Sequence, residues 1–67
     1  MGKVVRNWAD LEAGRWVDVM NEAGQLERAC VDAVTPDGSI IWLVTEGTGA
    51  RSLHLSTDPV TLYLHSE

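Results

Sequence analysis

A chain of 67 residues is long enough for one small domain, and its ten acidic against five basic side chains give a net charge of −5. The single cysteine excludes an intramolecular disulfide, and Cys30, His54 and His65 together are too few for a four-ligand zinc site within one copy. No apolar run approaches the ~18 residues that a membrane-spanning helix needs, so we expect a cytoplasmic protein with no membrane partner.

The first element that we expect is a short helix at residues 8–13. Asn7 is a favourable N-cap, and Gly14 suits the left-handed position that follows a helix C-terminus. Trp8 and Leu11 are three residues apart and would lie on one face of this helix. A helix this short is not stable alone, so we expect it to pack against the rest of the domain.

From residue 15 onward the apolar residues alternate with a period of two, and turn residues recur about every ten to twelve positions, which is typical of an antiparallel meander. The clearest turn is Thr35-Pro36-Asp37-Gly38, because proline presets φ and glycine accepts a left-handed conformation. These signals predict five strands, at residues 15–21, 26–34, 39–45, 50–55 and 60–65.

The alternation also predicts which side of the sheet each residue faces. The inward-facing residues have small or aliphatic side chains, and in the second and fourth strands we expect them to be Ala29, Val31, Ala33, Leu53 and Leu55. A sheet this small protects its edges by curling. We therefore expect a mainly β fold, a five-stranded antiparallel barrel of the Sm-like or SH3-like type with a short N-terminal helix, and the helix favours the Sm-like type.

A pattern spread along the chain resembles a known family. It comprises Leu11-Glu12-Ala13, Gly24, Ala29, Asp32, Trp42-Leu43-Val44, Gly49, Arg51, Leu53 and Leu55. This pattern is similar to that of the Rof family, small acidic proteins that inhibit the Rho transcription-termination factor and have an N-terminal helix followed by a Sm-like sheet. The resemblance implies a non-enzymatic protein whose acidic face occupies a partner's nucleic-acid site.

The aromatic residues are the strongest candidates for a binding site. Trp16 and Trp42 lie opposite the aliphatic residues of their strands, and with Tyr63 they would form an exposed patch flanked by Asp18 and Asp32. In the alternative reading, Trp8 or the helix covers one of the tryptophans as a second small core. The leading hypothesis is a non-catalytic module that binds a protein partner, and the acidic charge favours a basic one.

Two other functions remain open from the sequence. The same aromatic face would bind single-stranded nucleic acid if Arg15, Arg28 and Arg51 contacted phosphates, although the net charge disfavours this. A homo-oligomer would bring several copies of His54 or Cys30 together at an interface and create a catalytic or small-ligand site. Within one copy we expect no enzyme, no catalytic residue, no metal site and no cofactor, and we expect Arg15 and Arg28 to neutralise Asp18 and Asp32.

Overall fold

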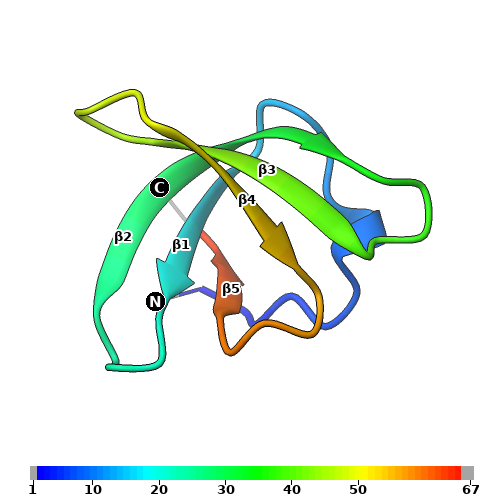
Figure 1. Ribbon diagram of the computed structural model, residues 1–67, viewed down its shortest axis with the longest axis horizontal. Helices are drawn as coiled ribbons and strands as arrows, with labels where there is room; N and C mark the ends of the chain where they lie inside the picture. Colours follow the sequence, from blue (N-terminus) through cyan, green and yellow to red (C-terminus); the bar gives the residue numbers. More distant parts are fainter. Residues whose placement is uncertain (1, 66–67) are drawn as a thin grey trace.

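The chain folds into one antiparallel sheet of five strands. The computed structural model describes residues 2–65, with β1 (Trp16–Met20), β2 (Leu26–Val34), β3 (Ile40–Thr45), β4 (Arg51–Leu55) and β5 (Thr61–Leu64). The strand order is β4-β3-β2-β1-β5, and each neighbouring pair is antiparallel (Figure 1). The predicted mainly β fold is confirmed, and each predicted strand matches to within one residue at either end.

The predicted closure into a barrel does not occur. β4 and β5 are the two ends of the strand order, and no pairing joins them within residues 2–65. The segment between these strands contains Asp58-Pro59, where proline has no N–H to donate and restricts the residue before it. The sheet is therefore curled but open between β4 and β5.

The predicted helix at residues 8–13 is a single 3-10 turn, Trp8–Asp10. Its N-cap is as predicted, since the Asn7 side chain accepts a hydrogen bond of 3.0 Å from the Ala9 N–H. The backbone becomes extended at Leu11, where φ is −85° and ψ is 147°. Trp8 and Leu11 are both buried, so core packing, rather than helix propensity, fixes this conformation. No helix in the described part of the chain is long and apolar enough to cross a membrane.

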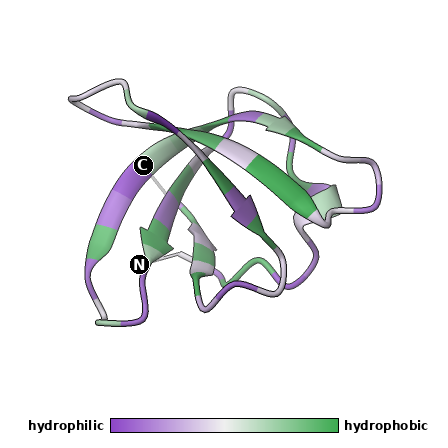
Figure 2. Ribbon diagram, in the orientation of Figure 1, coloured by the Kyte–Doolittle hydropathy of each residue, from purple (hydrophilic) through white to green (hydrophobic). Residues whose placement is uncertain are grey.

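The core lies on the inner, concave side of the sheet. Its side chains come from four strands and from the 3-10 turn with Leu11, and they are Trp8, Leu11, Val17, Ala29, Val31, Ile41, Leu43 and Leu62. Figure 2 shows the long hydrophobic stretch of β3 that supplies two of them. Each fully buried aliphatic side chain contributes about 1.5–3 kcal/mol. Trp8 belongs to this core, so it does not cover Trp16 or Trp42 as a second one.

A β-bulge in β2 changes the predicted face of Ala33. Val31 pairs with Leu43, and the next paired residue is Ala33 opposite Trp42, so Asp32 is an extra residue in the ladder. Ala33 therefore shares the outer face with Trp42, and Val34 takes the inner position opposite the buried Ile41. The prediction that Ala33 faces the core was wrong because strict alternation does not allow for an inserted residue.

The turn between β2 and β3 forms as predicted. The Gly38 N–H donates to the Thr35 carbonyl oxygen at 2.9 Å, and Gly38 has φ of 74°. The Asp37 carboxylate accepts from the Ser39 N–H at 3.0 Å, and from the hydroxyl groups of Ser39 and Thr35 at 2.8 Å each. These bonds, above all the one from the Ser39 N–H, hold the pKa of Asp37 below its ordinary value because they stabilise the charged form.

A short N-terminal segment, residues 3–5, lies along β5 and was not predicted. The Val5 N–H donates to the Leu62 carbonyl oxygen and the Leu64 N–H donates to the Lys3 carbonyl oxygen, both at 2.8 Å. Val4 forms an isolated antiparallel bridge with Tyr63. This segment therefore covers the edge of β5, and β4 remains as the other edge of the sheet.

Candidate interaction surface

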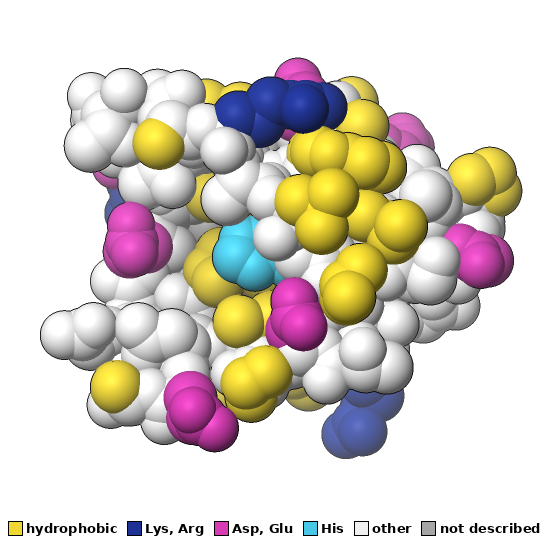
Figure 3. All heavy atoms as spheres, in the orientation of Figure 1, with side chains coloured by type: hydrophobic (Ala, Val, Ile, Leu, Met, Phe, Trp, Pro, Cys, Tyr) yellow, Lys and Arg dark blue, Asp and Glu magenta, His cyan; other side chains and the backbone are white. Residues whose placement is uncertain are grey.

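An exposed apolar surface lies on the outer side of β3 and β4, facing away from the core. Trp42 pairs with Leu53 and Ile40 pairs with Leu55, so these four side chains project from the same side of the sheet. Leu53 is 52% exposed and Leu55 is 41% exposed. Figure 3 shows hydrophobic side chains gathered in a group on this side of the molecule. We call Ile40, Trp42, Leu53 and Leu55 the β3–β4 apolar face.

The prediction that Leu53 and Leu55 face inward was wrong. The inner side of β4 carries Ser52 and His54, whose Oγ and Nε2 atoms are 2.9 Å apart. These two side chains border a hollow of about 260 Å³ that is lined in part by polar residues of the β1–β2 hairpin. Alternation puts Leu53 and Leu55 on one side of β4 and Ser52 and His54 on the other, but it does not say which side faces the core. The more hydrophobic pair was predicted to face inward. This was wrong because β4 is an edge strand whose inner side lies over a partly polar hollow.

Arg51 connects the β3–β4 apolar face to the bulge in β2. Its Nε atom lies 2.8 Å from the Asp32 carboxylate, and its Cζ atom lies 5.6 Å from the centroid of the Trp42 ring. Both side chains of the ion pair are about half exposed, so the pair itself stabilises the fold by roughly 1 kcal/mol or less. Its structural effect is to hold a guanidinium group over one part of the Trp42 ring.

The predicted partner-binding residues divide into two groups. Asp32 lies beside Trp42, as described above, whereas Trp16 and Asp18 lie on β1 and Tyr63 lies on β5 opposite Asp18. Trp16 is 38% exposed and is separated from β3 by the whole of β2. Two strand spacings amount to about 10 Å, so the backbones of the two tryptophans lie at least that far apart, on strands that are not neighbours.

The three arginines of the nucleic-acid alternative are not brought together. Arg28 lies 3.6 Å from Glu46, and Arg51 pairs with Asp32. Arg15 lines a groove near the N-terminus. The expected neutralisation of Asp18 and Asp32 by Arg15 and Arg28 holds only in part. Arg28 lies directly opposite Asp18 on the neighbouring strand, but its ion pair is with Glu46. Asp32 pairs with Arg51, and the Asp18 carboxylate lies 3.2 Å from His65 Nδ1.

The cysteine and the two histidines lie apart. Cys30 is on the outer side of β2 between Trp16 and Val44, while His54 is on the inner side of β4. His65 follows β5, at the opposite end of the strand order from β4. Within the part of the chain that the structure describes, no group of three or more His, Cys, Asp or Glu side chains is arranged to hold a metal ion.

A groove of about 750 Å³ lies between the N-terminal segment and residues 10–15. Lys3, Arg6 and Arg15 are among the residues that line it, and the sequence pattern does not predict a groove in this region. The only sequence signal was that two of the five basic residues fall within the first six positions.

Comparison with protein-family models, with curated proteins and with solved structures finds no match to this chain.

Proposed function

We propose that this chain is a non-catalytic interaction module that binds a protein partner through the β3–β4 apolar face. The observation that carries the proposal is the exposure of Leu53 and Leu55 beside Trp42 on an edge strand. Clustered exposed apolar side chains with an aromatic anchor are typical of protein interfaces. An uncovered edge strand with such a face is also prone to aggregation, so a partner that covers it would protect the protein.

The charge of the chain favours a basic partner, since acidic side chains outnumber basic ones by ten to five. The strand order supports assignment of the open sheet to the Sm-like or SH3-like type. The resemblance to the Rof family supports a partner that itself binds nucleic acid.

A capture experiment with matched variants tests this proposal. Wild-type protein and the Leu53→Glu/Leu55→Glu double variant are immobilised, and the proteins that they retain from a lysate are quantified by mass spectrometry. Leu26→Glu is the control. Leu26 is 46% exposed, but it is the first residue of β2 and lies outside the β3–β4 apolar face. We expect wild type and the control to retain the same partner. The Kd of the purified partner for the double variant should be at least about tenfold higher than its Kd for wild type or the control. Equal binding by all three proteins would refute the proposed site.

A second candidate is single-stranded nucleic-acid binding at the same place, because Arg51 over Trp42 combines a cation with a partly exposed ring on which a base can stack. Titration of wild-type protein and the Trp42→Leu variant with oligonucleotides at low and high salt distinguishes the two functions. Quenching of tryptophan fluorescence that is lost in Trp42→Leu and in high salt would assign nucleic acid to the face. Absence of quenching at low salt would remove this candidate.

A further inference from the structure

The distribution of unpaired cations singles out the groove near the N-terminus. Arg28 and Arg51 have acidic partners on the outer side of the sheet. Lys3, Arg6 and Arg15 form no ion pair within residues 2–65, and all three line this groove. The domain is acidic overall, yet the three basic residues that form no ion pair among residues 2–65 all belong to segments that border one hollow, together with Asp10 and Glu12. Charges within about 8–10 Å act more strongly on a bound group than distant ones at physiological salt.

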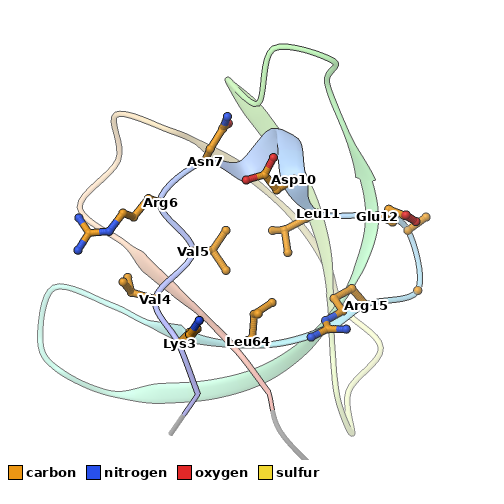
Figure 4. Close-up of a pocket in the computed structure, with 12 residues that line it drawn as sticks. Lys3, Val4, Val5, Arg6, Asn7, Asp10, Leu11, Glu12, Arg15 and Leu64 are labelled. Carbon is orange, nitrogen blue, oxygen red and sulfur yellow. The ribbon is translucent and has the colours of Figure 1, made fainter.

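The floor of the same groove is apolar. Val5, Leu11 and Leu64 point into it from three different segments, whereas Val4 and Arg6 project from the other side of the N-terminal segment (Figure 4). Arg15 reaches in from the opposite side, toward Leu64 (Figure 4). The lining combines an apolar floor with three basic and two acidic side chains, so it suits a ligand that has an apolar part and places its negative charge beside the basic ones.

The backbone of the N-terminal segment supplies a third feature. The Lys3 carbonyl oxygen and the Val5 N–H bond to β5, so in an extended chain the N–H and C=O of Val4 point toward the opposite edge. Neither group forms a hydrogen bond within the described residues, and Val4 is 42% exposed. An unpaired strand edge at a groove accepts an extended peptide as an added strand.

We propose that the groove binds an extended peptide segment in which acidic and apolar residues alternate. The peptide pairs with Val4 as an additional strand on the edge of the N-terminal segment that faces away from β5. The alternation of a strand then places its apolar side chains on the side of Val5, Leu11 and Leu64 and its carboxylates on the side of Val4 and Arg6, while Lys3 and Arg15 add positive charge to the lining of the groove. Asp10 and Glu12 line the groove on the side opposite the N-terminal segment, so the carboxylates are expected beside the N-terminal segment. This site is separate from the β3–β4 apolar face, and its occupant has the opposite charge from the partner proposed for that face.

The test is a titration of ¹⁵N-labelled protein with an acetylated and amidated pentapeptide, Glu-Val-Glu-Val-Glu, followed by amide chemical shifts and hydrogen exchange. We expect shifts at Val4, Val5, Arg15 and Leu64 and slower exchange of the Val4 amide. The Arg6→Gln and Arg15→Gln variants should each weaken the Kd about two- to fivefold. The matched control is Arg28→Gln, which removes a basic side chain outside the groove and should leave the Kd unchanged.

Three further arms decide between the possible occupants. Lys-Val-Lys-Val-Lys should not bind, because it presents the wrong charge. The acidic peptide N-methylated at the central glutamate and at both valines should bind much more weakly, because it lacks the N–H donors that would pair with Val4 in either strand direction. Octanoate provides an apolar anion without a peptide backbone. Equal shifts with octanoate and no protection of Val4 would assign the groove to small amphipathic anions and overturn the proposal. Shifts confined to β3 and β4, or no shifts at millimolar peptide, would also overturn it.

Discussion

Gly38 satisfies two separate requirements. Its φ of 74° is one that other residues adopt at a cost of about 1–2 kcal/mol. In addition, a Cβ atom there would lie 2.6 Å from the backbone nitrogen of Ala9, so the β2–β3 turn packs directly on the 3-10 turn. Gly47 also has positive φ, at 90°, but a Cβ atom there would meet no atom within 4 Å. The two glycines therefore allow the packing contribution to be measured apart from the conformational one.

We expect Gly38→Ala to lower the free energy of unfolding by about 1–3 kcal/mol more than Gly47→Ala does, because only the first change forces backbone atoms apart. The measurement is urea denaturation of both variants, followed by tryptophan fluorescence. Equal losses in the two variants would show that the contact between Gly38 and Ala9 contributes nothing.

The bulge in β2 determines what the outer side of the sheet presents. Because Asp32 is the extra residue, Val31 and Val34 both face the core, and the Asp32 side chain reaches Arg51. Removing Asp32 would leave Ala33 directly after Val31, which is the spacing of a regular strand that still pairs Ala33 with Trp42. The bulge is thus a local insertion that the sheet does not need for its register.

We therefore expect the protein that lacks Asp32 to fold. Its free energy of unfolding should be lower by about 1 kcal/mol or less, because the ion pair with Arg51 is lost. Deletion of Cys30 is the control, because it turns either Ala29 or Val31 away from the core. This variant should not fold and should show no cooperative unfolding transition. Circular dichroism and urea denaturation of the two variants make the comparison. An unfolded Asp32 deletion would mean that the bulge itself is required for folding.

The sequence predicts the strands well because a period of two and a Pro-Asp-Gly turn are local signals. It does not predict the bulge, since nothing in the immediate surroundings of Asp32 distinguishes an inserted residue from a paired one. It also misplaces Leu53 and Leu55, because the inner side of an edge strand is set by what lies across the sheet. Val4 and Val5 form too short an apolar run to indicate a strand. The candidate binding surface was therefore found only in part, through Trp42 and Asp32.

The whole sheet should show a gradient of stability from its centre to its edges. The Val31 N–H in β2 and the Val5 N–H in the N-terminal segment each form a backbone hydrogen bond of 2.8 Å, to Arg15 and Leu62 respectively. They differ in position, since Val31 is buried in a central strand and Val5 lies at the sheet edge. Edge segments open locally at a lower free energy than central strands do.

We expect the Val5 and Leu64 amides to exchange on the order of 100-fold faster than that of Val31 in native-state hydrogen exchange. Gly2→Ala provides a directed perturbation, because a Cβ atom at residue 2 would overlap the Leu64 carbonyl oxygen. This variant should accelerate exchange at Val5 and Leu64 and leave Val31 unchanged. A uniform acceleration at all three amides would indicate that the N-terminal segment and the sheet unfold as one unit.

The hydrogen bond between Lys3 and Leu64 places the beginning and the end of the folded unit next to each other. A unit whose entrance and exit are adjacent can be spliced into a surface loop of another protein with short connections at both junctions. In such a fusion the host chain would leave and rejoin at the β5 edge, and β4, at the other end of the strand order, would remain free. The β3–β4 apolar face could then be carried on a chosen host as a transplantable docking surface.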